Sequence, residues 1–215
     1  MTTREVFLGV VRERLRQPAS PGHLRPIGPV SDEALRYGVD LTDLQAAFVT
    51  SATAAGAEMV GGPDEEVSAV VERVLDEVEP SRAVVAEDSE CHGVAEILAR
   101  RGVEVVPLGD PISAAKADLG ITGAVAGVSL TGSLVVDSAR ARTRLASLLP
   151  EVHLALLSVG RLVKTPGEVF RSLSRDPDGP PSNLVFITGP SRSADIELEI
   201  TIGVHGPRRV LIALL

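Results

Sequence analysis

Apolar and polar residues repeat with helical spacing in three stretches of the first part of the chain. The first stretch begins at the capping box Thr2-x-x-Glu5 and ends before Pro18. Residues 41–55 are expected to form a second helix. Pro63 suits the first position of a third helix, whose apolar stripe is the clearest in the sequence and joins Val67, Val70, Val71, Val74, Leu75 and Val78.

From residue 82 onward, short apolar runs alternate with helical segments. Helices are expected over 90–101, with Ser89 as the cap and Gly102 as the stop, and near 166–174. Strands are expected at 82–86, 103–106, 118–124, 133–136, 152–158, 184–188 and 210–214. This alternation predicts an α/β fold with a mainly parallel sheet and helices on both faces.

Two segments depart from this rhythm. Residues 18–31 are rich in proline and glycine, which predicts an extended surface arm. Residues 196–202 alternate isoleucine or leucine with polar residues, which favours a strand, and a short helix that begins at Ser191 is the alternative. We therefore divide the chain into an N-terminal helical and proline-rich arm, residues 1–63, and an α/β domain, residues 64–215.

Composition narrows the classes of function. A chain of 215 residues with 44% hydrophobic residues can bury a sizeable core. The net charge of −8 argues against nucleic acid as a partner, because such binding requires clustered cations that displace counterions. Apolar runs are shorter than the roughly 18 residues that a membrane span needs, and the N-terminus lacks an apolar signal core. We expect a cytoplasmic protein with no membrane span.

Cysteine and histidine are too sparse to predict a metal centre. The single cysteine, Cys91, excludes an intrachain disulfide and cannot supply the four thiolates of an ordinary iron–sulfur cluster. The 4 histidines are scattered, without a His-x-x-x-His pair. His153 lies inside the apolar run 152–157, where a histidine of the core or of a crevice is expected. We therefore predict no metal and no cofactor in this chain.

The best candidate for a binding site is a glycine-containing loop after an apolar strand. In open α/β sheets, ligands bind beyond the carboxyl ends of the strands, where glycine lets backbone N–H groups approach an anion. The loop 188–192 and the pairs Thr122-Gly123 and Thr131-Gly132 are of this kind. We expect a small carboxylate or phosphate at Thr131, Gly132, Gly189, Pro190, Ser191, Arg192 and Asp195. The alternative is a turn in which Arg192 pairs with Asp195 or Glu197.

Two residues of the same region are candidates for proton transfer. Asp195 and Glu197 are two residues apart, so they share one face of the expected strand, and Glu197 can move a proton. His205 stands between Gly203 and Gly206-Pro207, and histidine is the residue type that most often serves as a general acid or base. We take Glu197 and His205 as candidate catalytic residues. The alternatives are a solvated strand face for Glu197 and a structural, carbonyl-bonded role for His205.

The segments 189–197 and 203–207, spaced as they are, resemble the signature of the LUD-domain family. Supporting matches are 120–124, 131–133 and 148–153. The resemblance is strong over about 118–215, weaker over 64–117 and close to absent before residue 64. It therefore covers both glycine motifs that carry the candidate chemistry.

The resemblance implies a fold similar to the group of sugar-phosphate isomerases, CoA-transferases and formyltetrahydrofolate cyclo-ligases. It also implies a role in the oxidation of L-lactate to pyruvate beside two partner proteins, one of them rich in iron–sulfur clusters. A chain with one cysteine fits that division of labour. The alternatives are a stand-alone enzyme of the isomerase, CoA-transferase or cyclo-ligase type, and a non-catalytic interaction scaffold that docks through the arm.

Two positions depart from the family pattern. Ser193 replaces the common threonine and keeps its hydroxyl group. Leu130 stands where relatives often carry a carboxylate, directly before Thr131-Gly132. If that carboxylate is catalytic in relatives, this chain lacks the group.

Overall fold

In the computed structural model the chain divides into two units, residues 1–38 and residues 39–215. This second unit begins before residue 64, the predicted start of the α/β domain. The predicted arm over 18–31 lies outside the described residues, as does the first helix except for residue 13. The structure describes residues 13, 40–138, 141–173, 181, 183–194, 200–202 and 205–215.

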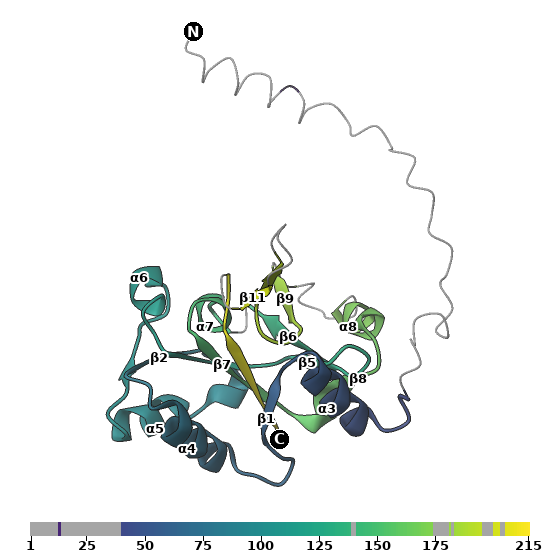
Figure 1. Cartoon of the computed structure of the whole chain (residues 1–215), viewed down its shortest axis with the longest axis horizontal. Helices are drawn as coiled ribbons and strands as arrows, with labels where there is room; N and C mark the ends of the chain where they lie inside the picture. Colours follow the sequence, from purple (N-terminus) through teal and green to yellow (C-terminus); the bar gives the residue numbers. More distant parts are fainter. Residues whose placement is uncertain are drawn as a thin grey trace. The chain divides into compact units, whose positions relative to one another are not determined.

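A six-stranded sheet forms the centre of the unit (Figure 1). All neighbouring strands in it are parallel, which confirms the predicted α/β class. In order across the sheet the strands are β1 (Glu58–Gly61), β12 (Arg209–Leu214), β7 (Val152–Leu157), β4 (Leu119–Gly123), β2 (Arg82–Val85) and β3 (Glu104–Val105). Every residue of β4 and β7 is buried, as expected for central strands covered on both faces.

Helices cover both faces of this sheet, as the alternation of strands and helices predicts. On one face, α4 (Val67–Val78) and α5 (Val94–Arg100) pack against Val85 and its neighbours. The opposite face meets α6 (Pro111–Ala114) and α7 (Leu145–Leu148) around Val84. Residues 84 and 85 point to opposite faces because side chains alternate along a strand. Figure 1 shows α4 and α5 below the sheet and α6 and α7 above it.

The helix α3 (Leu44–Ala54) packs over β7 and β12 on the same face as α7. Its buried Phe48 and Ala52 meet Leu157 and Ile212 in one apolar cluster. The Asp43 side chain accepts a hydrogen bond from the Ala46 backbone N–H and caps the start of the helix. This packing places the end of α3 against the loops that the sequence singled out.

A second, four-stranded sheet lies beside the main one and is mixed in direction. The predicted strands near 133–136 and 184–188 belong to it, paired antiparallel. In order its strands are β8 (Leu162–Val163), β5 (Ala126–Val128), β6 (Ser133–Asp137) and β9 (Leu184–Ile187). The helix α8 (Pro166–Leu173) follows β8, and its Phe170 ring lies 5.7 Å from that of Phe186.

The segment after Ser191 forms a strand, which decides between the two predicted alternatives. β10 (Arg192–Ala194) pairs antiparallel with β11 (Ile200–Ile202). The strand alternative is therefore confirmed over residues 200–202, and the helix that would begin at Ser191 is wrong because residues 192–194 are also a strand. The residues between the two strands, 195–199, lie outside the described part of the chain and include the candidates Asp195 and Glu197.

The predicted helix over 90–101 is wrong in its first part. A 3-10 turn, η1 (Ser89–Cys91), follows β2, and α5 begins only at Val94. Gly93 interrupts the helix because it adopts a φ of 77°, the left-handed region that favours glycine. The interruption leaves an irregular loop after β2, and this loop lines the cavities described below.

The strand order contains a point where the chain changes direction across the sheet. From β2 the chain passes through α5 to β3 at one edge, and it then returns to β4 on the other side of β2. Loops that leave β2 and β4 therefore diverge, which opens a crevice beyond the carboxyl ends of these strands. Glu87 and Asp88 follow β2 at this point.

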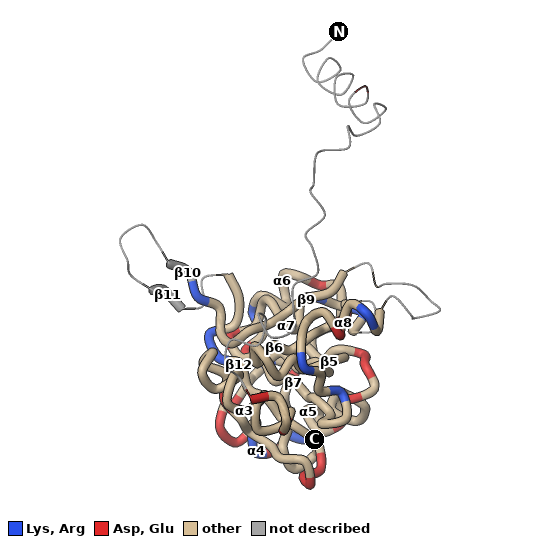
Figure 2. Tube along the Cα trace, turned by 90° about the vertical axis from the view of Figure 1, so that its right-hand side faces the viewer, with Lys and Arg blue, Asp and Glu red and all other residues tan. Residues whose placement is uncertain are grey.

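Charged residues of both signs are interspersed along the described part of the trace (Figure 2). Most ion pairs are exposed, such as that of Arg82 with Glu104, and add little stability. Arg209 in β12 is more enclosed and binds Glu58 of β1 through two N–H groups, at 2.8 and 2.6 Å. The helices among the described residues include none that is both long and apolar enough to cross a membrane.

Candidate functional site

The two glycine motifs that stood out in the sequence fold against one another. We use the name glycine-loop surface for residues 189–192, residues 205–207 and the end of α3 at residues 54–56. The Ser191 backbone N–H donates to the Pro207 carbonyl at 2.9 Å, and a Cβ at Gly206 would lie 3.2 Å from that of Ser191. The two motifs are thus in direct contact in the structure.

Gly189 is required by close packing of the backbone. It has a φ of 72°, and a Cβ added there would lie 2.2 Å from the Ala55 carbonyl oxygen. No side chain fits at that distance. The glycine therefore lets the loop reach the carboxyl end of α3, and the space beside it is filled by protein.

Arg192 is bound to the same helix end. Its Nη2 donates to the Ala55 carbonyl at 2.8 Å. The carboxyl end of a helix carries partial negative charge, so a guanidinium group stabilises it. Arg192 is exposed and keeps further N–H donors toward solvent. It can therefore cap the helix and face an incoming anion with its remaining donors.

A chain of three hydroxyl groups joins the two predicted loops. Thr131 Oγ1 lies 2.6 Å from Ser133 Oγ, which lies 2.7 Å from Thr188 Oγ1. Gly132 has a φ of 64°, and a Cβ there would lie 2.1 Å from the Ala52 backbone nitrogen. Thr131 and Gly132 therefore join the site through Thr188, which precedes Gly189.

Of the remaining candidates of this region, the structure describes one and leaves two outside the described residues. His205 is exposed and directly precedes Gly206, so it lies on the glycine-loop surface. Asp195 and Glu197 fall outside the described residues. The roles assigned to His205 and Glu197 in proton transfer, and to Arg192 and Asp195 in anion binding, stay predictions.

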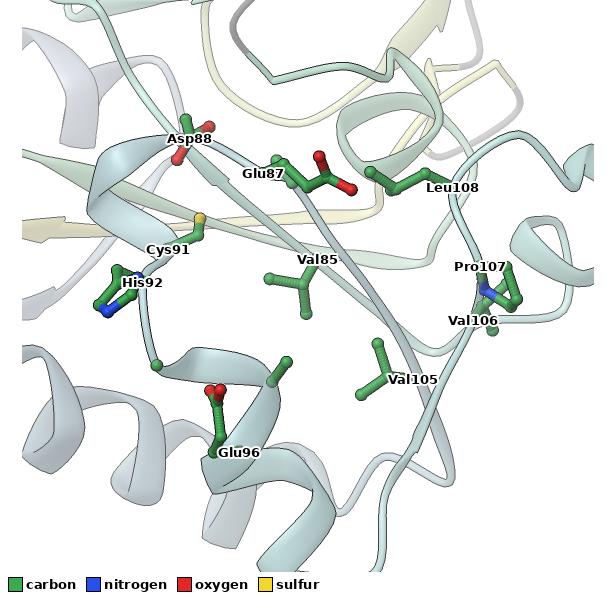
Figure 3. A pocket seen from close by; sticks show the side chains of 13 residues that line it. Val85, Glu87, Asp88, Cys91, His92, Glu96, Val105, Val106, Pro107 and Leu108 are labelled. Carbon is green, nitrogen blue, oxygen red and sulfur yellow. The ribbon is translucent and has the colours of Figure 1, made fainter.

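A second region contains open space, and the pair Thr122-Gly123 marked it in the sequence only through Gly123. We use the name crevice for two cavities beyond the carboxyl ends of β2, β3 and β4, which share Glu87 and Asp88 as lining residues. The larger cavity has a volume of about 440 Å³ and lies between the loop after β2 and the end of β3. Figure 3 shows Val85 and Val105 in its centre, with the carboxyl groups of Glu87 and Glu96 on two sides of them.

Asp88 holds the loops after β2 and β4 together. Its two carboxylate oxygens accept the Gly123 backbone N–H at 3.0 and 2.8 Å. The buried Cys91 thiol also hydrogen-bonds to Asp88. Burial and the nearby charges of Asp88 and Glu90 raise the pKa of this thiol far above its ordinary value. The wall between the two cavities is therefore bonded in place and carries a protonated thiol.

The smaller cavity, of about 240 Å³, lies at the change of direction between β2 and β4. Arg161, from the turn η2 (Val159–Arg161) after β7, lines it and bonds to Glu90 at 2.5 Å and to the Ala124 carbonyl at 3.1 Å. Asp137, at the end of β6, lines its other side. Four carboxylates and one guanidinium thus surround this cavity, namely Glu87, Asp88, Glu90, Asp137 and Arg161.

The hydroxyl chain and the smaller cavity lie at opposite ends of one strand. Ser133 begins β6 and Asp137 ends it. A strand rises about 3.3 Å per residue, so the two groups are roughly 13 Å apart along it. The glycine-loop surface and the crevice are therefore separate regions. Glu87 and Asp88, directly after an apolar strand, were the sequence signal that could have identified the crevice.

His153 of β7 and Thr122 of β4 form a buried pair in the main sheet. Thr122 Oγ1 lies 2.9 Å from His153 Nε2, and neither side chain is accessible to solvent. Complete burial lowers the pKa of His153 to about 4, so the ring is neutral at physiological pH. The prediction of a core histidine is confirmed. The described atoms offer no hydrogen-bond partner to its Nδ1.

The fold and its two regions define a doubly wound α/β protein with a switch-point crevice and a glycine-loop surface at separate places. The model of the LUD domain family matches residues 46–215. The chain therefore belongs to the LUD domain family, and the expected resemblance is confirmed. The match includes both the crevice and the glycine-loop surface.

Two bacterial relatives are named lactate utilization protein C. The protein from Exiguobacterium is 41% identical over 101 residues, which are 45% of this chain and 44% of the relative. The protein from Halalkalibacterium halodurans is 39% identical over 99 residues, which are 45% of this chain and 43% of the relative. Each match thus spans less than half the length of the relative.

A crystal structure of a DUF162 family protein from Deinococcus radiodurans has a similar fold. Its TM-score with this chain is 0.59 at 21% sequence identity. The superposition covers 86% of this chain and 99% of that one. This likeness supports the α/β architecture and the order of its elements.

Proposed function

We propose that this protein is a component of L-lactate utilisation that contributes to the oxidation of lactate to pyruvate in the cytoplasm. The observation that carries the proposal is the similarity to proteins named lactate utilization protein C. The membership in the LUD domain family over residues 46–215 supports it. The glycine-loop surface adds a place where a small anion can be held.

The redox step of this function is assigned to partner proteins that carry iron–sulfur clusters. Oxidation of lactate to pyruvate releases two electrons, which need an acceptor. The chain has one cysteine, Cys91, which is buried and whose pKa is raised, so its thiol is poorly suited to bind iron as a thiolate. A complex in which the clusters belong to partner oxidoreductase subunits satisfies this need.

The small carboxylate or other anion of the reaction is assigned to the glycine-loop surface. Arg192 supplies guanidinium donors at its edge, and Thr131, Thr188 and Ser191 supply hydroxyl groups nearby. The remaining donors of Arg192 can bind a carboxylate while Nη2 stays on the Ala55 carbonyl. His205 lies on the same surface and can exchange a proton with a bound hydroxy acid.

Growth of the source organism on L-lactate tests this function. Deletion of the gene is expected to abolish growth on L-lactate and to leave growth on glucose unchanged. Complementation with Arg192→Ala is expected to restore growth poorly, whereas Arg208→Ala, which removes a neighbouring exposed arginine, is expected to restore it fully. Undiminished growth of the deletion strain on L-lactate would contradict the proposal.

A purified complex tests the assignment of partners. Affinity purification of the full chain from cells grown on L-lactate is expected to recover proteins with the visible absorption of iron–sulfur clusters. The same purification from glucose-grown cells is the control. If the chain purifies alone under both conditions, the assignment of the redox step to iron–sulfur partner proteins is refuted.

A further inference from the structure

The larger cavity of the crevice has an apolar body and an acidic rim. Aliphatic side chains form about half of its walls, among them Val85, Val105 and Pro107 on the strands and loops of β2 and β3. Three carboxylates also line it, those of Glu87, Asp88 and Glu96. Its described lining contains neither lysine nor arginine. The cavity therefore favours a ligand with an aliphatic frame and no negative charge.

The three carboxylates differ in the hydrogen bonds and ion pairs that they already make within the protein. Asp88 accepts the Gly123 N–H with both oxygens and also binds the Cys91 thiol, so it serves mainly to hold the wall. Glu87 pairs with Arg142 at 2.9 Å, and both side chains are largely exposed. Such a pair contributes little and can be exchanged for another cation. Glu87 is therefore available to a ligand.

Glu96 stands on the other side of the cavity, on the first turn of α5. Its negative charge offsets the partial positive charge at the amino end of this helix. The helix therefore adds no net attraction for an anion in the cavity. Figure 3 shows the carboxyl groups of Glu87 and Glu96 separated by the valine side chains of the cavity. A ligand with donors at two ends of a short aliphatic chain matches this arrangement.

We propose that the larger cavity binds a small aliphatic amine, whose ammonium groups are held by Glu87 and Glu96 and whose carbon chain lies against Val85 and Val105. The net charge of −8 of the whole chain also attracts such a cation. This site lies apart from the glycine-loop surface, and its ligand is of opposite charge to the carboxylate assigned there. The inference goes beyond the role in lactate utilisation and can hold or fail independently.

Three probes with the same four-carbon frame test the chemistry of the cavity. Putrescine carries two ammonium groups, 1,4-butanediol is its uncharged counterpart, and succinate is its anionic counterpart. Each is titrated into the full-length protein with methyl groups of valine and leucine labelled for NMR. Putrescine is expected to shift the resonances of Val85, Val105 and Leu108, with butanediol weaker and succinate without effect. Equal or tighter binding of butanediol or succinate, or no binding of putrescine, would overturn the proposal.

Variants that each remove one negative charge test where putrescine binds. Glu87→Gln and Glu96→Gln are each expected to weaken putrescine about two- to fivefold, as expected for partly exposed charge pairs, and the double variant about tenfold. Glu151→Gln is the control, since it removes the same charge at the amino end of β7, away from the crevice. Far-UV circular dichroism checks that each variant is folded. If Glu151→Gln weakens putrescine as much as the other two, the amine binds only as a diffuse counterion and the site is refuted.

Discussion

The glycine-loop surface and the crevice use the protein chain in opposite ways. At the glycine-loop surface, backbone fills the available space, since Gly189 and Gly132 approach the α3 backbone more closely than any side chain would allow. In the crevice, side chains surround an open volume of about 440 Å³. A glycine-rich motif can thus be required for packing as well as for ligand approach. Open space lies instead beyond the carboxyl ends of β2 and β3.

The glycine-loop surface and the crevice also differ in the charge of their side chains. Arg192 bonds to the carboxyl end of α3, whereas Glu87 and Glu96 face a cavity whose described lining holds neither lysine nor arginine. One N–H group of Arg192 is thus already bonded to a helix end at the glycine-loop surface, whereas the carboxylates of Glu87 and Glu96 remain available to a ligand in the crevice. The following tests separate packing from binding in each region.

The largest effect is expected from a methyl group at the tightly packed glycines. Gly132→Ala and Gly189→Ala must each strain a positive φ and displace backbone of α3. The sum of these costs is about 4 kcal/mol of the free energy of unfolding. Urea denaturation measures it.

Gly102→Ala is the matched control, because Gly102 has a φ of 75° with no atom within 4 Å of an added Cβ. It is expected to cost only the strain of the backbone, about 1 to 2 kcal/mol. Equal losses in all three variants would show that the contacts with α3 are unimportant, and the contrast between the regions would fail.

A slightly smaller effect is expected from acid, through the buried pair of His153 and Thr122. The pKa of His153 is about 4 in the folded protein and 6.5 in the unfolded chain. Because the unfolded chain binds the proton more tightly, stability is complete above pH 6.5 and falls as the pH drops toward 4. The expected loss is about 3 kcal/mol.

His153→Gln removes this titration and keeps an amide to bond Thr122. The difference in unfolding free energy between the wild type and this variant is expected to shrink or change sign between pH 6.5 and 4. Denaturation at a series of pH values measures the difference. A difference that is independent of pH would mean that the ring is protonated or solvated in the folded state.

Thiol reactivity tests how firmly the wall of the crevice is closed. Burial and the carboxylates of Asp88 and Glu90 raise the pKa of Cys91, so the folded protein contains almost no thiolate. Reaction with a disulfide reagent at pH 8 is expected to be on the order of a hundredfold slower than in denaturant. Fast reaction in the folded state would show that the loop after β2 opens readily.

The smallest effect is expected at Arg192. Replacement by alanine removes one exposed hydrogen bond to the Ala55 carbonyl, which is worth about 1 kcal/mol of unfolding free energy. Arg208→Ala is the control and is expected to be neutral. If Arg192→Ala leaves stability unchanged yet abolishes growth on L-lactate, the arginine acts on a ligand and its bond to the helix is incidental.

Much of the fold could be predicted from the sequence, because apolar runs such as 152–157 and 210–214 are long enough to identify buried strands. β1 and β5 were missed since they are short, and β5 consists of Ala126, Gly127 and Val128. The separate, mixed sheet was also missed, because direction and partner depend on topology and not on apolar spacing.

The candidate site was predicted less completely than the fold. The glycine motifs are continuous in sequence, so their proximity to one another could be anticipated. The crevice joins residues 85–96 with residues 105–108, and only the strand order brings these stretches together. The attachment of Arg192 to α3 spans 137 positions and has no local signature in the sequence.

The place of β12 between β1 and β7 has a consequence for synthesis on the ribosome. β1 lies at an edge of the main sheet, and its only strand partner among the described residues is β12. Glu58 and Arg209, which bond these two strands together, are 151 positions apart. During synthesis, α3 and β1 leave the ribosome before most of the domain has been made. They can pack against β12 only after that strand has been synthesised. The edge that carries the end of α3, and with it the glycine-loop surface, is therefore expected to be completed late in folding.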